Sequence, residues 1–175
     1  MAKVIQSDTR QKRKHHDVKE QYFVEQGYTI VKSKMLVGDY CIPSRTNICV
    51  DTKASIGELY SNLIQDHERF RAECQYAQDC GIKLVILVDN DQDIRTIDDV
   101  KHWKNPRMFA YYKKRGSFMR RGLKPPPPPA SNVQLVKIMW SMQKKYGVEF
   151  QFCSPEEAGR RVIEILEGED EGRSD

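Results

Sequence analysis

Five consecutive large apolar residues, Leu84 to Val88, limit how this chain can fold. A strand that exposes one face to solvent alternates apolar and polar residues, and this run does not alternate. It is therefore typical of a central strand whose two faces are both covered. Apolar residues recur at helical spacing both before this run and after it, from Asn132 to Tyr146. We expect an α/β fold in which helices flank a sheet.

A β-hairpin is predicted between residues 35–42 and 48–53, which both have the pattern of extended segments. If the chain reverses near Arg45, the two segments pair as antiparallel strands. Because side chains alternate between the two faces of a strand, the apolar pairs share one face and the acidic pair shares the other. The expected opposite pairs are Asp39 with Asp51, Tyr40 with Val50, Cys41 with Cys49, and Ile42 with Ile48.

The two aspartates of this hairpin predict a metal site. Directly opposed carboxylates have Cβ atoms about 5 Å apart and repel each other, so a positive charge between them is expected. Lys53 follows Asp51 by two residues and returns to the same face. Two carboxylates and a lysine that converge on one point are typical of a divalent-metal hydrolytic site. The alternative is that Asp39 only ends a strand, and that Asp51 and Lys53 form an ordinary surface ion pair.

The length of 175 residues, with 39% hydrophobic and 31% charged residues, suits one globular domain. No apolar run approaches the roughly 20 residues that span a bilayer, and the first residues lack a signal-peptide pattern. We therefore expect a cytoplasmic protein with no membrane partner. Five cysteines without CxxC spacing favour reduced thiols over a disulfide framework or a zinc knuckle. An oxidised cross-strand bridge between Cys41 and Cys49 is left open.

The positive charge of the chain is concentrated in residues 101–124. This window contains nine lysines and arginines and no acidic residue, although the whole chain carries a net charge of only +4. Cations neutralise phosphates and aromatic rings stack on unpaired bases, so the window predicts nucleic-acid binding rather than a merely solvated face. We expect a mobile clamp, followed by a stiff spacer of five prolines at 125–129. The aromatic residues of the window are Trp103, Phe109, Tyr111, Tyr112 and Phe118.

Four short segments of the chain resemble a known nuclease family. They are Val4-Ile5-Gln6-Ser7-Asp8-Thr9-Arg10, Val37-Gly38-Asp39-Tyr40, Asp51-Thr52-Lys53 and Glu58-Leu59. In their order they are similar to the nuclease domain of XPF-type structure-specific endonucleases, which belongs to the PD-(D/E)XK superfamily. The resemblance covers roughly residues 4–89, including Arg69-Phe70 and the strand that ends at Asp89. The chain departs from the family at two points, because Asp51-Thr52 replaces Glu-Arg and Glu58 comes one position late.

The resemblance implies a restriction-endonuclease-like fold, a mixed sheet flanked by helices, and a site that uses Mg²⁺, which Mn²⁺ could replace. The catalytic residues would be Asp39, Asp51 and Lys53. The metal ligands would be Asp8, Asp39, Asp51 and the backbone carbonyl of Thr52, with Glu20 and Glu58 as minor candidates. The DNA-binding candidates are Arg10 and Arg69, together with Tyr111, Tyr112, Lys113, Lys114, Arg115, Arg120 and Arg121 from the basic window. The adjacent His15 and His16 are assigned to a basic, DNA-facing loop rather than to a zinc site.

The resulting prediction is a divalent-metal-dependent DNA endonuclease that hydrolyses phosphodiester bonds. The resemblance alone implies branched or flapped DNA during replication, recombination or repair, in a bacterial or phage-infected cell. Residues 1–168 would form a single stand-alone nuclease domain with an insertion at 101–124, followed by an acidic, disordered tail at 169–175. A homodimer is left open. The alternatives are a non-catalytic DNA-binding module derived from a nuclease fold, and an RNA-processing nuclease.

Overall fold

The computed structural model describes residues 3–10 and 13–168, so the tail expected at 169–175 lies outside the described residues. Its six strands form one mixed sheet in the order β2-β1-β3-β4-β5-β6. Strand β3 runs antiparallel to both of its neighbours, whereas β1 pairs with β2, and β4 with β5 and β5 with β6, in parallel. The strands are β1 (Lys3–Asp8), β2 (Tyr28–Ser33), β3 (Tyr40–Ile42), β4 (Arg45–Lys53), β5 (Lys83–Asp89) and β6 (Glu149–Cys153).

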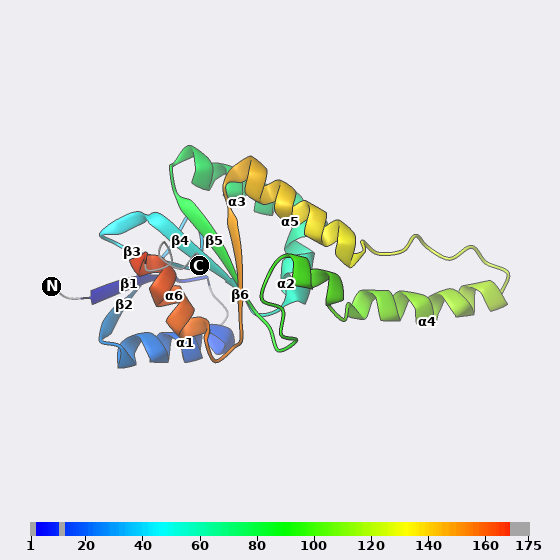
Figure 1. Ribbon diagram of the computed structural model, residues 1–175, viewed down its shortest axis with the longest axis horizontal. Helices are drawn as coiled ribbons and strands as arrows, with labels where there is room; N and C mark the ends of the chain where they lie inside the picture. Colours follow the sequence, from blue (N-terminus) through cyan, green and yellow to red (C-terminus); the bar gives the residue numbers. More distant parts are fainter. Residues whose placement is uncertain (1–2, 11–12, 169–175) are drawn as a thin grey trace.

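Helices cover both faces of this sheet, which confirms the expected α/β fold. Helices α1 and α6 lie on one face, and α2, α3 and α5 lie on the other (Figure 1). The helices are α1 (Arg13–Glu25), α2 (Ile56–Tyr60), α3 (His67–Asp79), α4 (Pro106–Arg120), α5 (Asn132–Tyr146) and α6 (Ala158–Glu167), with a π-helical segment η1 (Ser61–Gln65) and a 3₁₀ segment η2 (Asp98–His102).

Strand β5 is the covered strand that the apolar run predicts, because Leu84 to Val88 are each at most 2% exposed. Alternate residues of the run belong to the two separate hydrophobic cores on either side of the sheet. The helix expected at 132–146 also forms with these bounds. It starts there because Ser131 and Gln134 make a reciprocal capping box, and it ends because Gly147 adopts a left-handed conformation with φ of +66°.

The hairpin differs in part from its predicted register. Tyr40 pairs with Val50 and Cys41 with Cys49, as expected, but Ile42 lies opposite Arg45 and not opposite Ile48. The chain turns between Ile42 and Arg45, which is tighter than the predicted reversal centred on Arg45. The additional residues of β4 are taken up by an irregularity in the strand pairing after Cys41. Strand β3 also begins only at Tyr40, because Gly38 has a φ of +66° that breaks the extended segment. Cys41 and Cys49 are free, buried thiols.

The basic window folds as η2 followed by α4. No residue of α4 is buried, and the helix extends away from the sheet (Figure 1). The proline run at 125–129 has no helix or strand and lies in the long connection from α4 to α5. Trp103, expected with the DNA-stacking aromatics, is instead only 5% exposed and packs in the core against Tyr60. Charge and aromatic content cannot separate a buried ring from an exposed one, which is why this residue was misassigned.

No helix among the described residues is long and apolar enough to cross a membrane.

Candidate nuclease site

The ends of β1 and β4 and the start of β3 bring the predicted acidic residues together. The backbone N–H of Asp8 donates to the carbonyl of Asp39 at 2.9 Å, and the N–H of Asp39 donates to the carbonyl of Val50 at 2.8 Å. Asp51 follows Val50 directly, and it points to the face of the sheet that α3 covers. Three segments that are remote in sequence therefore place their acids at one edge of the sheet.

Asp51 and Lys53 form a buried ion pair on β4. The Lys53 Nζ lies 2.9 Å from each carboxylate oxygen of Asp51, and Asp51 is only 5% exposed. The pKa of Asp51 is raised to about 7, chiefly by burial; the Lys53 ammonium opposes this rise, and the carboxylates of Asp39 and Glu73 support it. Burial would lower the pKa of Lys53, but the carboxylates of Asp51, Asp39 and Glu58 together outweigh burial and hold the pKa above its ordinary value. The site thus contains more negative charge than its one lysine balances.

Asp39 is held by the residue that departs from the family pattern. Thr52 donates to Asp39 Oδ2 through its backbone N–H at 2.9 Å and through its hydroxyl at 2.8 Å. Gly38 is needed immediately before it, because a Cβ there would lie 3.0 Å from the carbonyl oxygen of Val50. Asp39 is therefore fixed against β4 by backbone and side-chain contacts together.

Glu73 is a site residue that sequence reasoning missed. Its Oε1 accepts a hydrogen bond from the N–H of Gly38 at 2.9 Å, which brings α3 over the loop before Asp39. Its carboxylate also contributes to the raised pKa of Asp51. The only available signal was its place on α3, beside the buried face that Phe70 and Cys74 mark.

Asp8 lies next to the other acids but binds Arg10. Its two oxygens accept hydrogen bonds from the Arg10 guanidinium at 2.7 to 3.2 Å, and Arg10 also donates to the carbonyl of Met35. Burial would raise the pKa of Asp8, but the hydrogen bonds from Arg10 outweigh it and hold the pKa below its usual range. Across the described residues, no three His, Cys, Asp or Glu side chains are grouped in a way that could hold a metal ion.

The two minor acidic candidates differ in position. Glu20 accepts from the Ser7 hydroxyl at 2.7 Å and pairs with Lys32, on the α1 face of the sheet and thus away from Asp51. Glu58 accepts from the N–H of Ala54 at 2.8 Å in the first turn of α2, just beyond the end of β4. It lies close enough to contribute to the raised pKa of Lys53.

A second buried ion pair lies on the opposite face of the sheet. Lys19 and Asp89 are each 3% exposed, and Lys19 Nζ lies 2.9 Å from Asp89 Oδ2 and 3.0 Å from His15 Nε2. His16 Nδ1 lies 2.6 Å from the hydroxyl of Tyr40 and is buried. The two histidines are therefore part of α1, and their assignment to a DNA-facing loop was wrong. Helical spacing of four residues brings His15 and Lys19 onto one face of α1, which was the signal available in the sequence.

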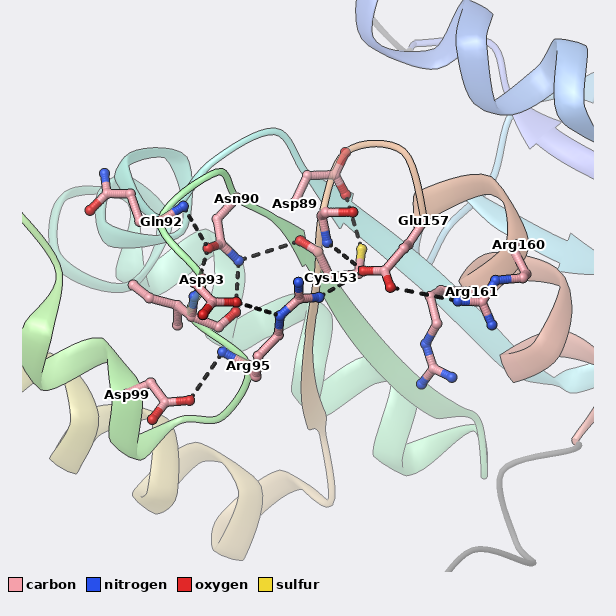
Figure 2. A network of polar contacts seen from close by, with 12 residues as sticks. Asp89, Asn90, Gln92, Asp93, Arg95, Asp99, Cys153, Glu157, Arg160 and Arg161 are labelled. Atoms are coloured by element: carbon pink, nitrogen blue, oxygen red, sulfur yellow. Dashed lines mark hydrogen bonds and ion pairs between the residues drawn. The ribbon is translucent and has the colours of Figure 1, made fainter.

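The loop after β5 is anchored beside this second pair. The side-chain oxygen of Asn90 accepts from the N–H of Ile94 at 3.0 Å, and its amide nitrogen donates to the carbonyl of Ile94 at 2.9 Å. Arg95 pairs with Asp93 and with Glu157 at the start of α6. Figure 2 shows these contacts, together with the hydrogen bond from the Asn90 amide to the carbonyl of Cys153 that joins the ends of β5 and β6. The segment that leads toward η2 and α4 is thereby fixed at its origin.

The comparison with solved structures assigns the fold. XPF from Aeropyrum pernix matches with a TM-score of 0.59 and 14% identity, over 97% of this chain and 66% of that one. XPF from Aeropyrum pernix in complex with DNA matches with a TM-score of 0.59 and 16% identity, over 99% of this chain and 68% of that one. The chain has the fold of the XPF nuclease. It spans about two thirds of the length of those solved chains.

No protein-family model matches the sequence, and no curated protein does. The identity of 14% to 16% is low enough that the likeness establishes the fold and leaves each site residue to be argued from its own surroundings. Asp8, Asp51 and Lys53 lie near the ends of β1 and β4, Asp39 lies just before β3, and Glu73 lies on α3.

Helix α4 carries most of the predicted DNA-binding residues. Its base is fixed by Arg107, which donates to the Ser61 hydroxyl at 2.7 Å and lies 4.5 Å from the centre of the Tyr60 ring. Tyr112 is 57% exposed, whereas Tyr111 is partly buried. Arg69 is exposed on α3. The predicted cations Lys113, Lys114, Arg115, Arg120 and Arg121 are all exposed.

Proposed function

We propose that this chain is a divalent-metal-dependent DNA endonuclease. The observation that carries the proposal is the group of acids around Lys53 on an XPF nuclease fold. The carboxylates of Asp39 and Glu73 contribute to the raised pKa of the buried Asp51. Such a group of acids is unfavourable unless a cation balances its negative charge. Lys53 supplies one positive charge, and a hard divalent cation that binds oxygen ligands would supply the rest.

The residues present fit such a cation by their chemistry. Asp39 and Asp51 would bind Mg²⁺ or Mn²⁺ through carboxylate oxygens, with the carbonyl of Thr52 as a further ligand. Asp8 would join them only if Arg10 released it. A bound divalent cation would polarise the phosphate and lower the pKa of a bound water.

The chain's own residues would do the remaining work. Lys53 would orient the attacking water and donate to the charge that develops on the phosphate. Glu73 and Thr52 would position the Asp39 segment through Gly38 and through Asp39 itself. Arg10, which is exposed beside Asp8, would hold a neighbouring phosphate with its guanidinium fork.

The substrate that we propose is branched or flapped DNA. The XPF structure in complex with DNA supports DNA as the polymer, and the cationic α4 offers it a second contact region. The preference for branches rests on the family resemblance alone. Roles in replication, recombination or repair follow from the same resemblance.

A second candidate function is a non-catalytic DNA-binding module. Two ion pairs favour it. Arg10 binds Asp8 and Lys53 binds Asp51, so two of the carboxylates that would bind a metal ion are already paired with a cationic side chain. In that case the ion pairs would only stabilise the fold. DNA binding would then depend on α4 and Arg10.

Cleavage of end-labelled flap, fork, four-way and linear DNA in Mg²⁺, Mn²⁺ or EDTA tests the proposal. We expect metal-dependent cuts that are fastest on branched substrates and that an Asp39→Asn variant does not make. Binding without metal-dependent cutting would favour the non-catalytic module. Faster cleavage of matched RNA substrates would indicate an RNA-processing enzyme.

A further inference from the structure

Helix α4 carries an apolar stripe that no other described residue covers. Phe109, Tyr112 and Met119 are 67%, 57% and 60% exposed, and Leu123, just after the helix, is 46% exposed. Their spacing of three, seven and four residues places them on one side of the helix. A 15-residue helix with no buried side chain is only marginally stable in water, so this stripe is suited to contact something outside the chain.

At the base of the stripe the surface forms an open groove of about 490 Å³. Trp103 lies at its inner side with only 5% exposure, and Phe109, Tyr112 and Val133 are its exposed walls. This volume falls within the roughly 300–1,000 Å³ of sites that bind small molecules. The groove can therefore accept a flat ring between exposed aromatic side chains.

The charges around the groove and the stripe are of one sign. No acidic residue lines the groove, and Lys104 is part of its lining. At 100° per residue, Lys113 and Arg120 lie along one flank of the stripe and Arg115 along the other. An occupant that complements this surface combines negative charge with exposed aromatic faces.

We propose that the groove and the stripe of α4 bind unpaired bases of a DNA strand, with the flanking cations on its phosphates. The inference rests on the proposed DNA-binding function and adds the part of the DNA that α4 contacts. Bases in a duplex are stacked on each other and cannot reach Phe109 or Tyr112, whereas unpaired bases can stack on both. A second copy of the chain is a poorer occupant, because pairing two α4 helices would oppose two sets of cations with no acid between them.

Aromatic residues on two sides of α4 provide a matched test. Phe109→Ala and Tyr112→Ala remove rings of the stripe, while Phe118→Ala removes a phenylalanine ring from the opposite side of the helix. Affinity of the full chain is measured in EDTA for oligothymidylate and for a duplex of equal length. Circular dichroism of each variant verifies that the fold is retained.

We expect Phe109→Ala and Tyr112→Ala each to weaken oligothymidylate binding about tenfold and to change duplex binding less than about twofold. The Phe118→Ala variant should bind both DNAs within about twofold of the parent. Equal losses on both DNAs, or a loss in Phe118→Ala as large as that in Phe109→Ala, would overturn the proposal. So would a concentration-dependent dimer that Phe109→Ala dissociates, because a second copy would then cover the stripe.

These measurements are independent of catalysis because no metal is present. A chain that cuts DNA but binds oligothymidylate equally well after Phe109→Ala would refute the inference alone. A chain that does not cut DNA but shows the expected difference would refute only the nuclease function. Absence of any DNA binding would refute both.

Discussion

Thr52 donates two hydrogen bonds to a single carboxylate oxygen of Asp39, one from its backbone and one from its hydroxyl at 2.8 Å. The residue that replaces an arginine of the family pattern therefore orients one of the two proposed metal-binding acids. This contact gives the departure a structural role. It also makes the hydroxyl, and not only the presence of Asp39, a testable part of the site.

Thr52→Val should lower cleavage on the order of tenfold, since a hydrogen bond to a charged group contributes roughly 1.5–3 kcal/mol. The backbone N–H would still hold Asp39, so the fold should persist. Single-turnover cleavage of a labelled flap measures the effect. Thr52→Ser keeps the hydroxyl and should retain most of the activity, and an equal loss in both variants would argue against this role.

Asp51→Asn should abolish cleavage while leaving DNA affinity in EDTA nearly unchanged. The substitution removes a carboxylate that would bind the cation but none of the cations that would contact DNA. Cleavage and fluorescence anisotropy on the same flap substrate measure the two effects separately. Asp17→Asn, at an exposed position on α1, is the control and should change neither. A parallel loss of binding and cutting would mean that Asp51 acts mainly in folding.

Much of the fold follows from local patterns in the sequence. The uninterrupted apolar run predicts β5, because both faces of that strand are covered. The spacing of Phe70, Cys74 and Ala77 predicts the buried face of α3. These features are local, so hydrophobic period and capping residues determine them.

The candidate site was predicted only in part, because its remaining contacts depend on tertiary structure. Asp39 and Asp51 are recognisable from their spacing, whereas Glu73 enters only because α3 crosses over Gly38. Ile42 was paired wrongly because a bulge, which the alternation of residues does not encode, changes the register. Lys19 and Asp89 come together from α1 and β5, far apart in the chain, and no local pattern predicts that pair.

Replacing Lys113, Lys114 and Arg115 by Gln should weaken DNA binding and flatten its salt dependence. Each phosphate contact that is lost reduces the slope of log K against log salt by about 0.9 on duplex DNA. The slope between low and moderate salt should therefore fall by up to about three. The control is a double variant with Lys3→Gln and Lys83→Gln. It removes cations at the first residues of β1 and β5, at the other end of these strands from Asp8 and Asp89, and should keep the parental slope. An unchanged slope in the α4 variant would place α4 away from the DNA.

Stability should fall at mildly acidic pH because of the buried His16 and the partly buried His15 on α1. Burial lowers the pKa of His16, and also of His15, below the value of about 6.5 for the unfolded chain. The unfolded state therefore binds these protons more readily. The contribution is fully present above about pH 6.5 and is lost as the pH falls through the depressed folded-state pKa.

Urea unfolding between pH 5 and 7.5 measures this dependence, with a slope of up to about 1.4 kcal/mol per pH unit for each histidine. His16→Asn should reduce the slope, although it also removes the contact with Tyr40 and lowers stability at every pH. Val18→Ala, at a 69% exposed position on the same helix, should leave the slope unchanged. A pH profile that His16→Asn does not alter would assign the dependence to other groups.

Lys19→Met should be strongly destabilising, because it leaves the Asp89 carboxylate buried without its cation. Breaking a buried pair from one side costs about 3–5 kcal/mol, and burial already raises the pKa of Asp89. In the Lys19→Met, Asp89→Asn double variant the unpaired charge is gone, so the loss should be smaller than the sum of the single losses. Lys101→Met breaks an exposed pair with Asp98 and should leave the urea midpoint nearly unchanged. Additive losses in the double variant would mean that Lys19 stabilises α1 by packing rather than by pairing with Asp89.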